Sequence, residues 1–147
     1  MKKVTVYTDG GSRGNPGPSA AGVLILNDKD QVIKKYSHFL GDGLTNNQAE
    51  YEAVIFALRK LKLLFGKKKA KDMKVEVRTD SEFLVNQLKG KYKIIDSKIK
   101  PLFINVWNLK IDFKEVLFVH ILREKNKEAD SLVNQSLDER SKKQTLI

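Results

Sequence analysis

The first third of the chain follows a two-residue period of hydrophobic and polar positions. Residues 3–8 alternate valine or threonine with lysine, threonine or tyrosine, as a half-buried strand does. A continuous apolar run at 20–26 and a mixed run at 31–40 come next, with the turn-forming residues 27–30 between them. We predict that these three segments are strands paired as an antiparallel meander.

The period changes to that of a helix between residues 47 and 65. Apolar side chains there recur at steps of three and four, which places them on one face of a helix. They are Tyr51, Val54, Ile55, Leu58, Leu61, Leu64 and Phe65. We predict that Asn46 or Asn47 caps this helix, that Glu50 lies in its first turn, and that Gly66 and the lysines after it end the helix.

The remaining sequence alternates strand and helix signals. We expect one domain over 1–140, followed by a flexible tail at 141–147. The element order indicates an α/β fold in which helices pack on a sheet. The expected elements are strands at 73–80 and 114–122, and helices at 81–90 ending at Gly90, at 99–111 around Pro101, and at 126–140 capped by Asn126.

Composition narrows the class of protein. The 147 residues include no cysteine, so disulfides and thiolate metal sites are excluded, and a reducing compartment is expected. No apolar run approaches the ~20 residues of a membrane span, and the N-terminal segment has no signal-peptide core. We therefore expect a cytoplasmic protein that does not bind membranes.

The charge is strongly basic. Lysine and arginine number 28 against 18 acidic residues, a net charge of +10. Such a surplus favours a polyanionic partner, of which nucleic acid is the commonest. A lysine-rich surface selected for solubility or heat tolerance is the alternative explanation.

Four carboxylates occupy places where predicted elements begin or end. Asp9 and Asp80 close strands, and Glu50 and Asp130 lie near helix starts. Taken singly, an acid in a first helical turn is explained by the helix dipole, and Asp80 by capping of the next helix. Together, acids beside core-facing positions would repel one another unless cations compensate.

Carboxylate ligands favour hard ions such as Mg²⁺ or Mn²⁺. If the four acids converge, they can hold two ions about 3.5–4 Å apart, as phosphodiester chemistry requires. Spacing alone does not establish that they converge, because the four are far apart in sequence.

Four sequence blocks resemble the motifs of type 1 ribonuclease H, in the same order and spacing over about residues 3–138. The blocks are YTDGGSRGNPGPSAAGVL, TNNQAEYEAVIFAL, RTDSEFLVNQL and HILREKNKEADSLVN. The resemblance implies a ribonuclease H-like α/β fold: a five-stranded mixed sheet, the first three strands antiparallel, with helices on both faces. It also implies hydrolysis of the RNA strand of an RNA–DNA hybrid with Mg²⁺ or Mn²⁺, leaving 5′-phosphate and 3′-hydroxyl ends.

The resemblance also implies the roles of individual residues. Metal binding falls to Asp9, Glu50, Asp80 and Asp130, and assistance in proton transfer or product release to His120. A half-buried structural histidine at the end of an apolar strand is the alternative for His120, because its loop has no glycine and Arg123 and Glu124 partly define it. Hybrid contacts fall to Gly10, Gly11, Ser12, Arg13, Asn15, Thr45, Asn46, Asn47, Gln48 and Ser81.

The glycines after Asp9 suit a strand end where backbone comes close to nucleic acid. The lysine runs at 66–71 and 89–100 are either a non-specific grip on the hybrid or solvated faces. The segment after the second helix is short, so the chain resembles a form without the basic handle of some relatives. We expect a monomer with no obligatory protein partner. A resolvase-like nuclease of the same fold, double-stranded RNA as a further substrate, and a non-catalytic binding module remain as alternatives.

Overall fold

A five-stranded mixed sheet forms the centre of the protein, in a computed structural model that describes residues 2–145. The strand order is β3-β2-β1-β4-β5. The first three strands pair antiparallel, whereas β4 pairs parallel with both β1 and β5, which confirms the predicted sheet. The strands are β1 Lys3–Ser12, β2 Gly17–Leu26, β3 Val32–Leu44, β4 Lys74–Thr79 and β5 Glu115–His120.

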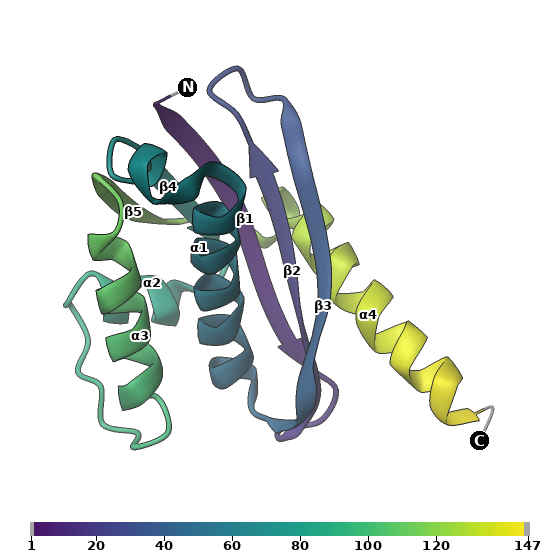
Figure 1. Ribbon diagram of the computed structural model, residues 1–147. Helices are drawn as coiled ribbons and strands as arrows, with labels where there is room; N and C mark the ends of the chain where they lie inside the picture. The colour runs from purple at the N-terminus through teal and green to yellow at the C-terminus, as the bar shows by residue number, and fades with distance from the viewer. Residues whose placement is uncertain (1, 146–147) are drawn as a thin grey trace.

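Helices cover both faces of this sheet, also as predicted. In Figure 1, α1 stands in front of β1 with α3 beside it, and α4 lies against the opposite face. The helices are α1 Asn46–Ala70, α2 Glu82–Leu88, α3 Lys100–Ile111 and α4 Lys127–Thr145, with a single 3₁₀ turn, η1 Arg123–Lys125, before α4. Residues 89–99 between α2 and α3 form no helix or strand, in agreement with a form that lacks the handle.

Two hydrophobic clusters fix the helices to the sheet. The larger one lies between α1 and the inner strands, and the smaller one lies under α4, where Ala20 of β2 meets Val133 and Leu137. Each fully buried aliphatic side chain stabilises the fold by about 1.5–3 kcal/mol. Central members of the larger cluster are Val4, Val6, Val23, Ile25, Val54, Leu58 and Leu61.

The start of α1 differs from the prediction. Thr45 is the N-cap: its hydroxyl accepts from the Gln48 N–H at 3.2 Å, and the Thr45 N–H donates to Gln48 Oε1 at 2.9 Å. This capping box satisfies two backbone donors at once, whereas an asparagine cap would satisfy one. Because the helix begins at Asn46, Glu50 lies in its second turn rather than its first.

The end of α1 is also corrected. Gly66 has φ 83°, a conformation outside the helix, yet helical structure resumes and continues to Ala70. Glycine adopts positive φ without a Cβ penalty, so it kinks the helix where we predicted that it would end it. Lys67, Lys68 and Lys69 form the last turn, where cations interact favourably with the helix dipole.

The segment 141–147, expected to be a flexible tail, overlaps the end of α4. Residues 141–145 continue α4 as helix, and residues 146 and 147 lie outside the described part of the chain. Each residue added to an existing helix gains one backbone hydrogen bond. The helix can therefore continue beyond Leu137, which is anchored in the small cluster, although the later residues add nothing to that cluster. Lys142 and Lys143 near the end suit the helix dipole.

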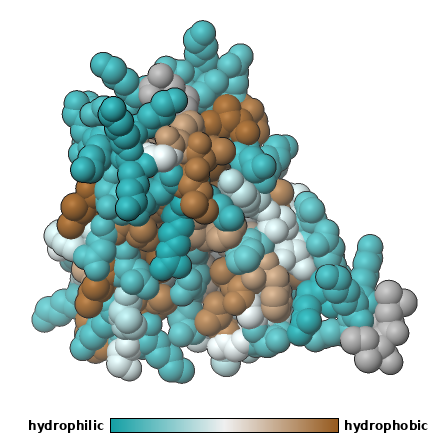
Figure 2. All heavy atoms as spheres, viewed as in Figure 1, coloured by the Kyte–Doolittle hydropathy of each residue, from teal (hydrophilic) through white to brown (hydrophobic). Residues whose placement is uncertain are grey.

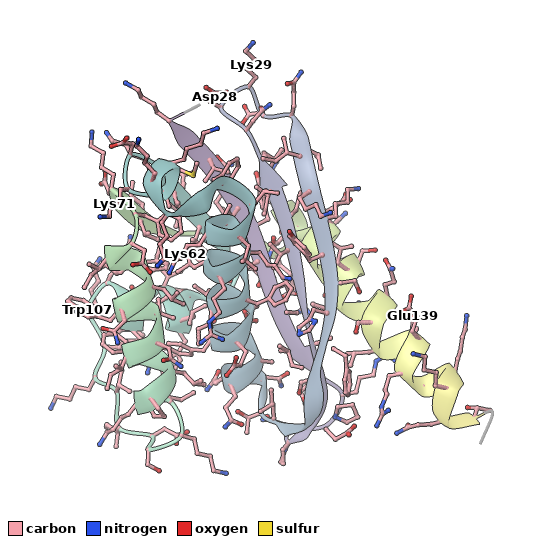
Figure 3. All side chains as sticks on the ribbon, viewed as in Figure 1. Asp28, Lys29, Lys62, Lys71, Trp107 and Glu139 are labelled. Carbon is pink, nitrogen blue, oxygen red and sulfur yellow. The ribbon has the colours of Figure 1, made fainter. Side chains whose placement is uncertain are left out.

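The face shown in Figure 2 is mostly hydrophilic, with hydrophobic residues gathered in several groups between the polar ones. Lys62 points from α1 towards α3 (Figure 3), where its Nζ lies 2.7 Å from Asp112 Oδ2 and joins the two helices. Within residues 2–145 there is no helix of the length and apolarity that a membrane crossing requires.

Candidate active site

The parallel pairing of β1 and β4 places two acids side by side. Tyr7 of β1 is in register with Arg78 of β4, and Asp9 and Asp80 each follow two residues later. Parallel strands end at the same edge of a sheet, so the two carboxylates meet there although 71 positions separate them. The register of a single strand pair therefore builds half of the acid cluster.

Gly10 brings the third acid to this edge. A Cβ at Gly10 would lie 2.1 Å from the Ala49 carbonyl oxygen and 2.5 Å from the Glu50 nitrogen. The absence of that carbon lets α1 approach β1 closely enough for Glu50 to reach Asp9. At Gly11 a Cβ would lie 3.1 Å from Val133 of α4. The two glycines thus make room for the protein's own helices, a different reason from the predicted approach of nucleic acid.

Three carboxylates form a compact cluster. Oxygens of Asp9, Glu50 and Asp80 all lie within 4.8 Å of one another. Asp9 is buried, with 8% of its surface exposed, and the other two are half-buried. An ion the size of Mg²⁺ needs oxygen ligands about 2.0–2.1 Å from its centre, which such a spacing allows. The predicted convergence is confirmed for these three acids.

Burial and repulsion between the acids dominate the electrostatics of the cluster. Burial, followed by repulsion from Asp80 and Asp130, raises the pKa of Asp9 to about 8. Burial and then Asp9 raise the pKa of Glu50 well above its usual range, although the Gly10 backbone N–H lowers it in part. Burial also raises the pKa of Asp80.

One oxygen of the cluster has no partner. Glu50 Oε2 is buried and accepts no hydrogen bond from any described residue. A buried carboxylate oxygen without a donor is costly, and a divalent cation would remove that cost while suppressing the repulsion between the acids. The cluster fits a hard divalent ion, because its donors are all oxygens, they lie close together, and one of them has no partner.

Asp130 joins the same hollow from α4 but is exposed and stands outside the three-carboxylate cluster. It is close enough to hydrogen-bond with Asp9. Gly22 of β2 allows α4 to lie this close to the sheet, because a Cβ there would be 2.0 Å from the carbonyl oxygen of Ala129. The fourth predicted acid therefore lies beside the cluster and not within it.

The hollow around the acids measures about 480 Å³ and is open to solvent. Arg123 of η1 reaches into it, and its charge lowers the pKa of Asp80 and Asp9. No ion pair joins Arg123 to a carboxylate among the described side chains. The arginine thus contributes positive charge at the rim without occupying the space between the acids.

Three predicted hybrid-contact residues form a hydrogen-bonded junction at one end of the hollow. The Ser12 N–H donates to Asn46 Oδ1 at 3.0 Å, and the Asn46 N–H donates to Asn15 Oδ1 at 2.9 Å. The Ser12 hydroxyl also donates to the Leu44 carbonyl at 2.9 Å. The loop after β1 is therefore tied to the start of α1.

Arg13 is exposed and reaches towards α4. Its guanidinium lies 2.6 Å from Asp138 Oδ1 and 3.4 Å from Asn134 Oδ1. Asn134 in turn donates to the Asp130 carbonyl at 3.2 Å. Arg13 still lines the hollow, as the prediction of a substrate contact requires.

The other predicted contact residues divide between two places. Ser81 lines the acid hollow and caps α2 by accepting from the Leu84 N–H at 3.3 Å. Thr45 and Gln48 are used in the capping box of α1. Asn47 lines a neighbouring hollow.

His120 is the last residue of β5 and is exposed. It pairs with Thr79, which immediately precedes Asp80. Within the described part of the chain, His120 is not among the residues that line the acid hollow. Its predicted part in the reaction stays a prediction.

Two asparagines were missed as members of the site. Asn134 lines the hollow and hydrogen-bonds to Asp130, and Asn126, expected only as a helix cap, is buried between β1 and α4. Asn126 was visible in the sequence as a polar residue just before the last helix. A helix cap and a site residue give the same pattern at that position.

The chain matches a known family along most of its length. The family model described as reverse transcriptase-like matches residues 7–136. A ribonuclease HI from Halobacterium salinarum is 33% identical over 140 residues, which cover 93% of this chain and 65% of that protein. A ribonuclease H from Caldicellulosiruptor saccharolyticus is 31% identical, with 91% of this chain and 90% of that one covered.

Solved structures agree. LC11-RNase H1, which was isolated from compost, has a structure in complex with an RNA/DNA hybrid. It has a TM-score of 0.87 and 45% identity over 93% of this chain and 98% of that one. The chain belongs to the ribonuclease H family. It spans 65% of the Halobacterium protein and 36% of three mycobacterial relatives.

Proposed function

We propose that this protein is a metal-dependent endonuclease that hydrolyses the RNA strand of RNA–DNA hybrids, leaving 5′-phosphate and 3′-hydroxyl ends. The observation that carries the proposal is the cluster of three carboxylates at one sheet edge, with the pKa of Asp9 raised to about 8 and an unpartnered Glu50 oxygen. Membership of the family supports the choice of substrate, since a relative of 45% identity binds an RNA/DNA hybrid.

In this proposal Asp9, Glu50, Asp80 and Asp130 hold two Mg²⁺ ions, or Mn²⁺ in their place. Bound ions of this kind lower the pKa of an attacking water and stabilise charge on the leaving oxygen. Asp9, buried and next to the other acids, would be one of the ligands. Asp130, exposed at the rim, would complete the coordination from the solvent side.

The protein's own groups orient the substrate. Ser12, Asn15 and Asn46 form a rigid polar junction beside the hollow, suited to the 2′-hydroxyls and base edges that an A-like minor groove displays. Arg123 and Arg13 place positive charge at the rim, where phosphates of the cleaved strand would pass. His120, near the end of the same edge, would assist proton transfer or product release.

A cleavage assay tests the proposal. A labelled hybrid, a double-stranded RNA and a branched DNA of matched length are incubated with the protein, with Mg²⁺ and with a chelator in its place. We expect the RNA strand of the hybrid to be cut only with Mg²⁺. Cutting of branched DNA alone, or binding of the hybrid without turnover, would reject the proposal in favour of a resolvase-like nuclease or a binding module.

We further propose that the protein acts as a monomer in the cytoplasm, without an obligatory protein partner. The lack of cysteine suits a reducing compartment. Light scattering of the active fraction would give the mass of two chains if the monomer proposal is wrong.

A further inference from the structure

Asn126 lies at the meeting point of three segments that carry acids. It stands between η1 and α4, and only 1% of its surface is exposed. Its Nδ2 donates to the backbone carbonyl of Thr8 at 2.9 Å, one residue before Asp9. An asparagine side chain this deeply buried in a small domain needs a reason, because an amide without full hydrogen bonding is costly to bury.

The side chain of Asn126 also reaches the second strand of the site. It lies close enough to the carboxylate of Asp80 to favour the ionised form of that acid and so to lower its pKa in part. A primary amide has two N–H donors, and the side-chain hydrogen bond that Asn126 makes goes to β1. Four residues further on, the Asp130 N–H donates to the Asn126 carbonyl at 3.1 Å, so the backbone of the same residue starts the helix that carries the fourth acid.

The pattern of hydrogen bonds argues against a helix cap. A capping asparagine accepts a backbone N–H through its side-chain oxygen. Asn126 Oδ1 is buried and accepts no hydrogen bond from the described residues. The amide is therefore oriented for its donors, and the acceptor that a cap would use is left unpartnered.

We propose that Asn126 is a positioning residue for the metal site: its side-chain N–H holds β1, next to Asp9, in register with the start of α4, which carries Asp130. This inference rests on the proposed function. Residues that orient metal ligands in this way typically change metal affinity or activity 10–100-fold when they are mutated. No step of the reaction is assigned to Asn126 itself.

Two substitutions separate positioning from capping. Serine is as good a cap as asparagine, but we expect its shorter side chain not to reach the Thr8 carbonyl that Asn126 Nδ2 contacts. A capping role predicts that Asn126→Ser behaves as wild type and that only Asn126→Ala is impaired. Positioning predicts that both are impaired to a similar degree. Asn105→Ser, at an exposed site on α3, is the matched control.

The main readout is Mn²⁺ binding without substrate, followed by electron paramagnetic resonance of the free ion. We expect both Asn126 variants to weaken Mn²⁺ binding by about tenfold or more, and Asn105→Ser to leave it unchanged. With hybrid, kcat should fall by a similar factor while KM stays within about twofold, because the contacts to the nucleic acid are intact.

Circular dichroism and the melting temperature show whether each variant folds. Wild-type Mn²⁺ affinity in Asn126→Ser would overturn the proposal, and so would a fall in melting temperature of Asn126→Ala without loss of affinity. Because the titration contains no nucleic acid, it remains decisive even if the wild-type protein cuts no hybrid, and that failure would count against the proposed function alone.

Discussion

At the scale of single residues, the site is defined by carboxylates that the fold holds against their mutual repulsion. Asp9 is the most constrained of them, because burial and two neighbouring acids act on it together. Removing the charge of Asp9 should therefore abolish catalysis and, by ending the repulsion, also raise the stability of the fold.

We predict that Asp9→Asn abolishes hybrid cleavage, by at least about a thousandfold, and leaves the fold intact. The amide keeps the shape of the carboxylate but loses the charge that would bind the metal. Single-turnover cleavage rates, with circular dichroism as the control for folding, measure the effect. Cleavage at the parent rate would contradict the assignment of Asp9.

The stability of the metal-free protein should fall with rising pH because of the same residue. The pKa of Asp9 is about 8 in the folded state against an ordinary 3.8, so the folded chain binds the extra proton between these two values. Stability from this group is complete below pH 3.8 and is lost as the pH rises to about 8.

In a chelating buffer, Asp9→Asn should therefore melt at a higher temperature than wild type at pH 8, by roughly 3 °C or more, and at nearly the same temperature at pH 4. Calorimetry at the two pH values measures the difference. Addition of Mg²⁺ at pH 8 should raise the melting temperature of the wild type only. An equal gap at both pH values would mean that the charge of Asp9 is not the cause.

At the scale of elements, close packing of helices on the sheet determines where the acids lie. A Cβ at Gly10 would collide with the backbone of α1, and a Cβ at Gly22 would collide with the backbone of α4. The sequence marked Gly10 as special, but for an approach of nucleic acid. Nothing local in the sequence indicated which helix would fill the space.

We predict that Gly10→Ala destabilises the fold by about 3 kcal/mol or more, because the methyl group would overlap the Ala49 backbone. It should also reduce cleavage, since α1 must move and take Glu50 with it. Urea unfolding and cleavage rates measure the two effects. Gly43→Ala is the matched control, because nothing lies within 4 Å of a Cβ there. Equal stability of the two variants would disprove the role of Gly10.

The elements themselves were largely predictable. Periodicity located all five strands and the helices, because α1 and the inner strands bury continuous apolar faces. It failed at ends, where local chemistry decides: the Thr45 capping box, the Gly66 kink and the extension of α4 to Thr145. The convergence of the acids was predictable only through resemblance to a family, since it depends on the β1–β4 register and on glycine contacts between distant segments.

At the scale of the whole molecule, the two lysine runs lie in different places relative to the site. Lys67–Lys69 end α1, roughly 25 Å along the helix from Glu50, at the end of the molecule where β4 begins (Figure 1). Lys91 and Lys93 line a hollow together with Asn47, at the start of α1. We therefore expect the second run to contact nucleic acid bound near the acids, and the first run to face solvent.

We predict that Lys91→Glu with Lys93→Glu weakens hybrid binding about tenfold or more at low salt, whereas Lys68→Glu with Lys69→Glu weakens it by less than about threefold. The net charge changes equally in the two double variants, so the comparison isolates position from overall charge. Fluorescence anisotropy in Ca²⁺, without turnover, measures affinity. Equal effects would show that the +10 charge acts only as a diffuse field.

Wild-type affinity should also fall steeply as salt rises, through release of counterions from phosphates. The slope of log affinity against log salt should be smaller for the Lys91 and Lys93 double variant than for the Lys68 and Lys69 one. A flat response in the wild type would mean that its basic surface serves some other purpose.

The four acids come from β1, α1, the end of β4 and α4, so the last of them is supplied late in the sequence. A chain emerging from the ribosome carries three of the acids long before the fourth arrives. Such an unfinished chain lacks both Asp130 and the packing of α4 on β2. The proposed cleavage would therefore require that α4 has been synthesised and has packed on β2.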